Sequence, residues 1–148
     1  MDTLVSSVAR TSSGNSGILN LANPQFIKAA LFELDVSLAA NVAGDKLNVF
    51  IQHSVDGTNF DDFVHFTEVL GDGGANRYLA TWVRDVSPES EMKPLTDGSL
   101  SAGSVLQGPV GDIWRVKWVI TDGGAHGQSF TFLVGAVLIY DERARAAL

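Results

Sequence analysis

Apolar and polar residues alternate along most of the chain with a period of two, which is the pattern of half-buried β-strands. In residues 31–39 the side chains of Phe32, Leu34 and Val36 share one face of the expected strand, and acidic residues lie between them. The same pattern predicts strands at 47–54, 60–70, 77–86, 112–121 and 129–140, and a weaker strand at 17–21. The chain is therefore expected to be all-β, with about seven or eight strands.

Glycine and aspartate residues separate the expected strands. Residues 41–45 predict a turn and an antiparallel hairpin between the strands at 31–39 and 47–54. Asp56-Gly57 predicts a second hairpin, whose returning strand leaves room for a β-bulge. A turn at residues 122–124 leads into the last strand and predicts a final hairpin. Short strands between such turns are typical of sandwiches, and we predict a two-sheet β-sandwich of jelly-roll type.

Helix has little room in this pattern. Residues 23–28 are expected to form one turn of helix, with Asn23 as its cap and Pro24 at its first position. The tail at 141–148 is a second short candidate.

The core is expected between the two sheets. Residues 129–140 are apolar on both faces, which predicts a central strand covered on both sides. The residues predicted in the core are Phe32, Leu34, Val36, Leu47, Val49, Ile51, Trp114, Val116, Trp118, Phe132 and Val134.

The chain of 148 residues is expected to be one domain, because a chain of this length buries a sizeable core. Residues 87–111 hold three of the four prolines and do not fit a minimal sandwich, so a long loop is expected there. Loops longer than about 12 to 15 residues are usually functional or disordered. This loop is interpreted either as an arm that docks on a partner or as a flexible loop that packs on its own domain. The residues assigned to the partner interface are Pro88, Met92, Pro94, Leu95, Leu100, Val105 and Leu106.

The N-terminal residues 1–16 are a second candidate arm, because residues 6–16 are rich in serine, threonine, glycine and asparagine. A frayed terminus is the alternative.

Composition narrows the possible partners. The formal net charge is -7, which removes long-range attraction to nucleic acid or to an anionic membrane. The chain has no cysteine, which excludes disulfides and thiolate metal sites. The first residues lack the basic and apolar regions of a signal peptide, and no stretch approaches the roughly 18 apolar residues of a membrane helix. We therefore expect a soluble protein that is synthesised in the cytoplasm.

No metal, cofactor or catalytic site is expected from the motifs. His53, His65 and His126 are far apart and have no metal-ligand spacing. Residues 56–62 carry oxygen ligands but lack the glycine and the closing glutamate of a calcium loop, so a hairpin turn is the better interpretation. The Asp-Gly-Gly motifs at 72–74 and 122–124 lie between expected strands and predict turns rather than phosphate cradles. The chain has no nucleophile elbow and no cysteine nucleophile, so we expect no enzyme activity.

The three tryptophans leave one alternative open. Trp82, Trp114 and Trp118 could serve as platforms for sugar rings, although Trp114 and Trp118 fall on the expected core face of their strand. Trp82 is the strongest candidate for such a platform.

Several segments resemble small virion proteins of tailed bacteriophages. They are TLVSSVART at 3–11, SGNSG at 13–17, LNVFIQHSVDGTNF at 47–60, WRV at 114–116 and the strand at 130–138. The resemblance implies a non-enzymatic head decoration or cement protein on the capsid surface, with the major capsid protein as partner and no cofactor. A tail or head-completion component is the alternative within this group, and a carbohydrate-binding or receptor-binding module is the competing class. Residues 87–111 depart from the shorter pattern of these proteins.

The expected assembly is a symmetric homo-oligomer, and a trimer is favoured. A contact between copies that did not close into a ring would polymerise. A three-fold ring also matches the local three-fold positions of an icosahedral shell.

Overall fold

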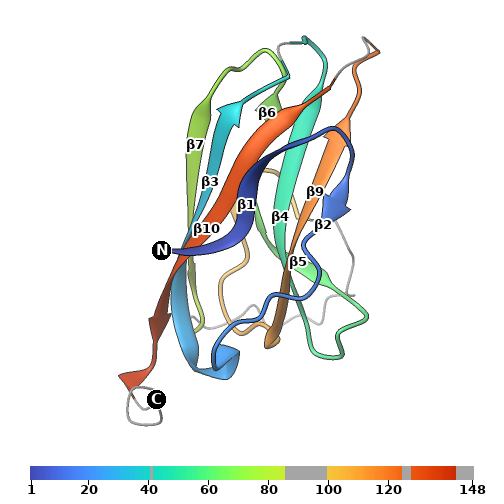
Figure 1. The fold of residues 1–148 in the computed structure, drawn as a ribbon. Helices are drawn as coiled ribbons and strands as arrows, with labels where there is room; N and C mark the ends of the chain where they lie inside the picture. The colour runs from blue at the N-terminus through green and yellow to red at the C-terminus, as the bar shows by residue number, and fades with distance from the viewer. Residues whose placement is uncertain (41, 86–99, 125–127, 143–148) are drawn as a thin grey trace.

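Two antiparallel β-sheets pack face to face in the structure, a computed structural model that describes residues 1–40, 42–85, 100–124 and 128–142 (Figure 1). The strands are β1 (Asp2–Arg10), β2 (Gly14–Asn15), β3 (Ile27–Leu38), β4 (Lys46–Ser54), β5 (Asp61–His65), β6 (Val69–Leu70), β7 (Asn76–Val83), β8 (Ser104–Val105), β9 (Ile113–Thr121) and β10 (Phe130–Tyr140). Sheet A has the order β1-β10-β3-β7, and sheet B has the order β2-β9-β4-β5-β8, with β6 paired to β4. The prediction of an all-β, two-sheet sandwich is confirmed.

The chain crosses between the sheets in the manner of a jelly roll. If the two-residue strands β6 and β8 are left aside, strands that are consecutive in the sequence lie in opposite sheets. The exception is β4 and β5, which form a hairpin. This gives two four-stranded layers, which is the eight-stranded jelly-roll arrangement. The β4–β5 hairpin carries the expected irregularity, a register shift between Ile51 and Gln52.

Two predicted hairpins are wrong. β3 pairs with β10 and β7 rather than with β4, and β9 pairs with β4 and β2 rather than with β10. The alternation of residues shows which side chains face the core, but it does not show which strand lies alongside. A short turn at the end of a sandwich can lead into the opposite sheet as readily as into the neighbouring strand.

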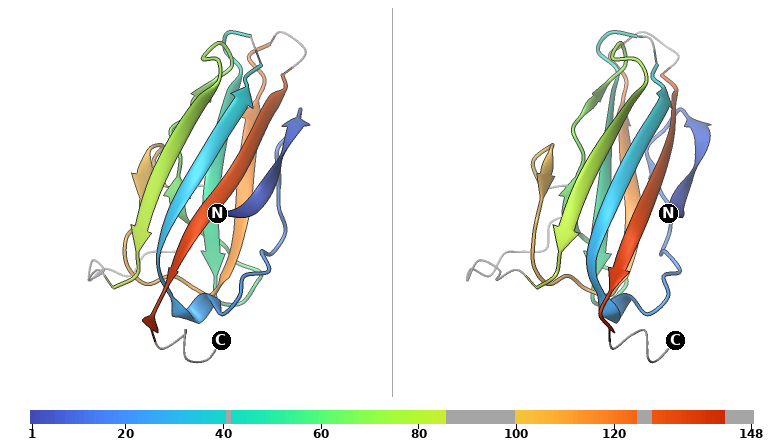
Figure 2. Two further views of the ribbon diagram at one scale, coloured as in Figure 1. Left: turned by 60° about the vertical axis from the view of Figure 1, so that its left-hand side comes forward. Right: turned by 90° about the vertical axis from the view of Figure 1, so that its left-hand side faces the viewer.

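The N-terminal residues run along one side of the sandwich. β1 pairs with β10 at the edge of sheet A, and β2 pairs with β9 at the edge of sheet B. Figure 2 shows these two strands on the side opposite β8. The stretch considered as an arm is therefore a component of the sandwich. The strand predicted at 17–21 is wrong, because β2 ends at Asn15 and an irregular segment follows.

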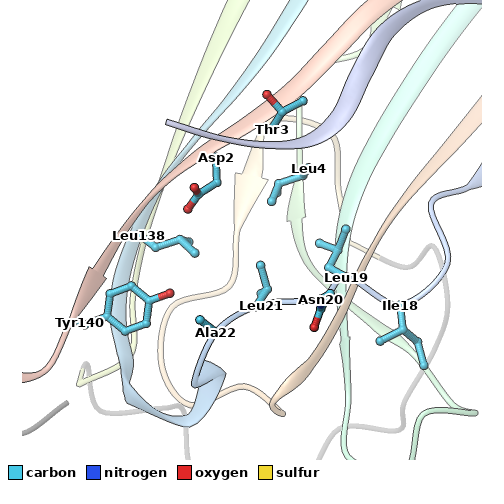
Figure 3. A pocket seen from close by; sticks show the side chains of 10 residues that line it. All are labelled: Asp2, Thr3, Leu4, Ile18, Leu19, Asn20, Leu21, Ala22, Leu138 and Tyr140. Atoms are coloured by element: carbon cyan, nitrogen blue, oxygen red, sulfur yellow. The ribbon is translucent and has the colours of Figure 1, made fainter. Parts of the chain in front are cut away.

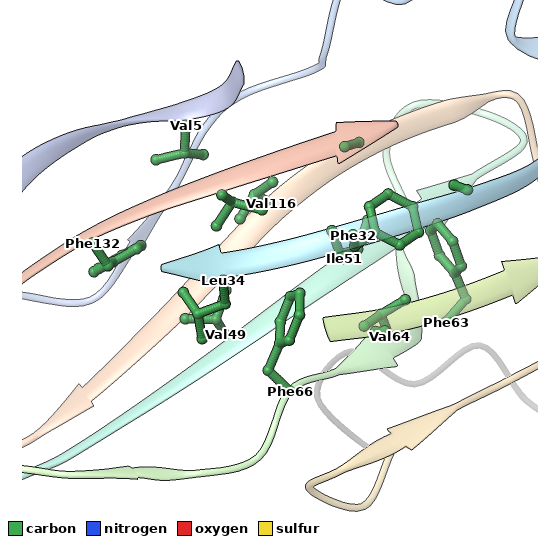
Figure 4. Close-up of a cluster of buried hydrophobic side chains, with 14 of the residues drawn as sticks. Val5, Phe32, Leu34, Val49, Ile51, Phe63, Val64, Phe66, Val116 and Phe132 are labelled. Carbon is green, nitrogen blue, oxygen red and sulfur yellow. The ribbon is translucent and has the colours of Figure 1, made fainter. Parts of the chain in front are cut away.

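The core lies between the sheets and draws on nearly all the predicted residues (Figure 4). Trp118 is the exception, because it is only partly buried against the cluster. Its Nε1 donates to the Ser12 carbonyl oxygen at 3.1 Å, and its ring meets Phe132 edge-on at 5.9 Å between centroids. Among the described strands, only the two-residue β2 lies outside β9 at this point, so the ring remains at the margin of the core.

An aromatic cluster fills one part of the core. Phe32, Phe63, Trp82 and Trp114 are fully buried, and Trp82 and Trp114 meet at 89° with 5.5 Å between ring centroids. Phe63 lies 5.0 Å from Trp114 and 5.6 Å from Trp82 between ring centroids. Edge-on pairs of this kind contribute about 0.5–1.5 kcal/mol beyond the burial of their area.

β10 is central in sheet A, as predicted, but it is not covered on both sides. Its inward residues Phe132 and Val134 are fully buried, whereas Val137 and Ile139 on the outer face remain 45% and 46% exposed. Within the described residues no third layer covers this face. The apolar outer positions thus signal an uncovered face rather than a doubly covered strand.

A single 3₁₀ turn, η1 (Pro24–Phe26), precedes β3. Pro24 occupies the predicted first position and Asn23 the predicted N-cap position, but Asn23 is left-handed at φ 47° and its side chain makes no cap hydrogen bond. The guanidinium of Arg84 donates to the carbonyl oxygens of Pro24 and Ile27 at 3.2 and 2.7 Å. The tail predicted to coil lies largely outside the described residues.

Candidate interaction surfaces

Residues 100–111 pack on their own domain. β8 pairs with β5, and the backbone N–H groups of Gly103 and Leu106 donate to the carbonyl oxygens of His65 and Phe63 at 2.9 and 2.8 Å. The Trp82 indole donates to the Gly108 carbonyl oxygen at 3.0 Å. The C-terminal half of the expected long loop therefore extends sheet B.

The seven predicted interface residues divide into two groups. Leu100, Val105 and Leu106 are half-buried, and the last two pack against the core. The other four, Pro88, Met92, Pro94 and Leu95, lie outside the described residues. Contact of these residues with a partner stays a prediction.

A buried polar chain on the outer face of sheet B holds the beginning of this segment. Arg115 Nε donates to Gln52 Oε1 at 2.7 Å, and Gln52 Nε2 donates to Asp62 Oδ1 at 2.7 Å. The other oxygen of Asp62 accepts the backbone N–H of Leu100 at 3.3 Å. The Arg115 guanidinium also lies 3.9 Å from the ring centroid of Phe60. Buried polar groups with partners fix the register of the segments they join.

His65 holds the carbonyl side of the same residue. Its Nδ1 lies 2.5 Å from the Leu100 oxygen, and its Nε2 lies 2.8 Å from Asn48 Oδ1. The Asn48 amide donates to Glu68 at 3.1 Å, and Lys46 lies 3.0 Å from Glu68. These donors lower the pKa of Glu68, with the Asn48 hydrogen bond as the main cause. Leu100 is thus held through both its N–H and its C=O.

The outer face of sheet A carries an apolar stripe, formed by Leu31, Leu79, Val137 and Ile139. Val137 is paired with Leu31 on β3, and Leu79 on β7 is 67% exposed. Leu79 lies opposite Glu33 and only diagonally to Leu31, so the stripe is interrupted at that end. The uncovered face of an antiparallel sheet is commonly polar, so this group of exposed apolar residues marks a candidate interaction surface. The sequence pattern did reveal the outer apolar residues of β10, but we interpreted them as covered. The stripe as a surface was missed.

The other end of this face is polar. Arg77 on β7 forms ion pairs with Glu33 at 3.4 Å and with Asp35 at 3.3 Å. The Arg77 side chain is 71% exposed, so these pairs contribute little stability. Together Arg77, Glu33 and Asp35 make one end of the outer face charged.

A cleft of about 500 Å³ opens beside the start of β1 (Figure 3). Leucine side chains line much of it, namely Leu4, Leu19, Leu21 and Leu138, and Asp2, Asn20 and Tyr140 add polar groups. Partial burial raises the pKa of the Tyr140 hydroxyl, and the negative charge of Asp2 raises it further. The described lining thus offers apolar packing and hydrogen-bonding groups.

A smaller groove of about 290 Å³, here called the β7–β8 groove, lies on the side opposite β1. Its lining residues are His65, Phe66, Thr67, Arg77, Tyr78, Leu79, Ala80, Gly103 and Val105. They come from the edge of sheet A and from the last strands of sheet B, so the groove marks the open side of the sandwich.

The acidic turn after β4 is held by its own chain. The Asp56 carboxylate accepts the backbone N–H groups of Thr58 and Asn59, both at 2.8 Å, and the hydroxyl of Ser54 at 2.9 Å. These hydrogen bonds, led by the one from the Asn59 backbone, hold the pKa of Asp56 well below its ordinary value. The arrangement is the predicted hairpin turn.

The described histidines are engaged in protein contacts. His53 Nδ1 accepts the Gly111 N–H at 3.0 Å, and His65 contacts Leu100 and Asn48. His126 lies outside the described residues. Among the residues that the structure describes, no three His, Cys, Asp or Glu side chains are grouped as a metal site would require.

The tryptophans do not form a sugar platform at the predicted positions. Trp82 and Trp114 are fully buried, with no ring face open to a ligand. Trp118 is packed against Phe132, and the Arg10 guanidinium lies 4.9 Å from its ring centroid. The sequence argument for carbohydrate binding therefore loses its strongest candidate, Trp82.

No helix in the described part of the chain is both long enough and apolar enough to cross a membrane. The chain was also compared with family models, with curated proteins and with solved structures, and none of the three comparisons finds a match.

Proposed function

We propose that this chain is a non-enzymatic structural protein of a phage virion, a head decoration or cement protein that binds the capsid lattice. The observation that carries the proposal is the outer apolar stripe of sheet A, because neighbouring exposed apolar residues on a sheet face are typical of a contact surface for another protein. The resemblance of the segments at 3–11, 13–17, 47–60, 114–116 and 130–138 supplies the kind of partner, the major capsid protein. A jelly-roll sandwich suits the role because it presents one broad, rigid sheet face to a lattice.

The charge distribution supports a surface position. The net charge of -7 disfavours contact with packaged DNA. The stripe residues are uncharged, and the exposed Arg77 beside them is paired with two carboxylates. A neutral contact surface on an acidic protein fits an outer position on a protein shell, with the copies arranged as a trimer.

Capsid attachment tests the proposal. Purified protein is mixed with undecorated capsids and pelleted, and cryo-electron microscopy locates the bound copies. Val137→Asp should reduce attachment by at least about tenfold, because it places a charge in the centre of the contact. Val55→Asp is the matched control, since Val55 is 77% exposed in the turn between β4 and β5, away from the stripe. Equal loss with both variants, or no attachment of the wild type, overturns the lattice role, and density confined to tails makes the protein a tail component.

The long loop is tested separately. Replacing residues 89–98 with a short glycine-serine linker leaves β8 and the contacts of Leu100 in place. Loss of the trimer in sedimentation, or loss of capsid attachment, supports a docking role for the loop. If the variant assembles and attaches like the wild type, the contact belongs to the sheet face alone.

A further inference from the structure

The two edges of sheet A differ in how they protect their backbone groups. β1, at one edge, has register shifts between Thr3 and Val5 and between Val5 and Val8. The Arg10 guanidinium then donates to the carbonyl oxygens of Ser6 and Val8 at 2.9 and 3.0 Å. Bulges and charged side chains are the usual means of blocking an edge strand against further pairing. The β1 edge is therefore closed.

β7, at the other edge, has no bulge, and its one charged side chain, Arg77, is paired with Glu33 and Asp35 on the sheet face. The Arg77 N–H is accepted by Asn76 Oδ1 at 2.9 Å. β7 pairs with β3 from Asn76 to Val83 without a register shift. The second half is covered, because the Gln107 side chain accepts the Val83 N–H at 2.7 Å and donates to the Thr81 oxygen at 2.8 Å. The Gly108 N–H adds a bond to the Val83 oxygen at 3.0 Å. Residues 106–108 thus cover the outer edge of β7 at Thr81 and Val83 and leave the part before Thr81 uncovered.

The uncovered half of β7 points its backbone into the β7–β8 groove. In a strand, the N–H and C=O of alternate residues point to the same side. Because the Thr81 C=O and both backbone groups of Val83 form hydrogen bonds on the outer edge, Leu79 directs its N–H and C=O to that edge as well. Within the part of the chain that the structure describes, these two groups of Leu79 have no hydrogen-bond partner.

The groove beside this edge has room for side chains and a mixed lining. Its volume is about 290 Å³, and Phe66, Ala80 and Val105 contribute apolar walls. Tyr78 and Thr67 add hydroxyl groups, and His65 and Arg77 add polar rims. An open strand edge beside a groove that can receive alternate side chains is the arrangement that binds an extended peptide by strand addition.

We propose that residues 77–81 of β7 form a strand-addition site, which takes an extended segment of another polypeptide whose alternate side chains are apolar and enter the β7–β8 groove. The backbone of the segment pairs with Leu79. The chain has a net charge of -7. Near the site the carboxylates of Glu33, Asp35 and Glu68 outnumber their cationic partners Arg77 and Lys46, so the segment is neutral or basic. This inference goes beyond the proposed virion role and does not depend on it.

A second copy of this chain is a poorer occupant than a free extended segment. Two β7 strands could pair edge to edge, but Ala80 and Trp82 of each copy are buried against their own core. Those side chains could not enter the groove of the other copy, which would stay unfilled. A segment that is not part of a sheet can turn its apolar side chains into the groove.

The test uses a synthetic peptide of alternating valine and threonine with lysine at both ends, titrated into ¹⁵N-labelled protein. The control peptide has the same sequence with N-methylated backbone at its central residues. We expect binding of the first peptide, with amide shifts at Leu79, Thr81 and Val105, and slower hydrogen exchange of the Leu79 N–H. Leu79→Pro should weaken binding about tenfold, because it removes the outward N–H without touching the ladder to β3. Leu79→Ala keeps that N–H and is the matched variant.

The outcomes separate the possibilities. Absence of binding, equal binding of the N-methylated peptide, or equal binding by the two Leu79 variants overturns the site. Amide chemical-shift changes that are confined to the cleft beside Tyr140 also overturn the site. So does protection of the Leu79 N–H from exchange that arises from dimerisation without peptide. If Leu79→Pro fails to fold, Val105→Lys narrows the groove from the opposite wall and should weaken binding, while Ser7→Pro on the closed β1 edge should leave it unchanged. Binding that survives Val105→Lys then counts against the groove.

Discussion

His53 couples the stability of the protein to pH. Burial lowers the pKa of His53 below its ordinary value of 6.5, although Asp61 and Asp62 act in the opposite direction. Its Nδ1 accepts the Gly111 N–H, which requires an unprotonated nitrogen. Because the pKa is lower in the folded chain than in the unfolded chain, the unfolded chain binds the proton first, and stability falls as the pH drops through the ordinary value.

We therefore expect the melting temperature to fall between about pH 7.5 and about pH 5, and His53→Asn to make this decrease smaller. Asparagine keeps an acceptor for Gly111 but has no basic group. Thermal denaturation of both proteins across this range is the measurement. Parallel curves for the two proteins would show that His53 does not contribute to the pH dependence.

Trp114 and Trp118 differ in their burial although they share one face of β9. Trp114 is fully buried among aromatic rings, so Trp114→Ala should destabilise by about 3–5 kcal/mol. Trp118 is partly exposed and packs mainly on Phe132, so Trp118→Ala should have a clearly smaller effect. Urea denaturation compares them directly. A larger loss for Trp118→Ala would mean that the margin of the core is packed more tightly than this structure indicates.

Arg10 acts at the scale of an element, because it closes one edge of sheet A. Its guanidinium reaches the carbonyl oxygens of Ser6, Val8 and Phe132, and it lies 4.4 Å from the ring centroid of Phe132. Partial burial of the guanidinium lowers the pKa of Arg10. A lysine has one ammonium group and cannot reproduce this planar fork of donors.

Arg10→Lys should therefore loosen the end of β1 and raise the tendency to associate through that edge. Hydrogen exchange of the β1 amides and light scattering at rising concentration are the measurements. We expect faster exchange at residues 2–10 and more scattering than in the wild type. Unchanged exchange would mean that the register shifts alone protect the edge.

The strands were predictable where apolar and polar residues alternate along the chain, as in β3 and β9, because burial of one face imposes a period of two. β1 was missed since serine, threonine and alanine occupy four of its nine positions and only Val5 is fully in the core. Strand partners were not predictable from turns, and the crossing connections of the jelly roll follow only from the register of whole strands.

The candidate surfaces were predictable only in part. The long loop was found from its prolines, yet the half that contains Val105 extends sheet B. Its hydrogen bonds to β5 and β7 depend on residues some 25 to 40 positions away, which no local pattern shows. The open edge of β7 is a property of sheet order, so the sequence of β7 alone could not reveal it.

At the scale of the whole molecule, the proposed lattice contact has a distinctive response to salt. The protein carries a net charge of -7, but the stripe of Leu31, Leu79, Val137 and Ile139 is uncharged. Salt screens contacts between charges, with a Debye length near 3 Å at about 1 M, and it does not weaken apolar burial. Capsid attachment should therefore persist from about 0.05 M to about 1 M sodium chloride. Co-pelleting across this range is the measurement. A loss of affinity of more than about tenfold would place the contact on charged residues such as Arg77 or Lys117 instead of on the apolar stripe.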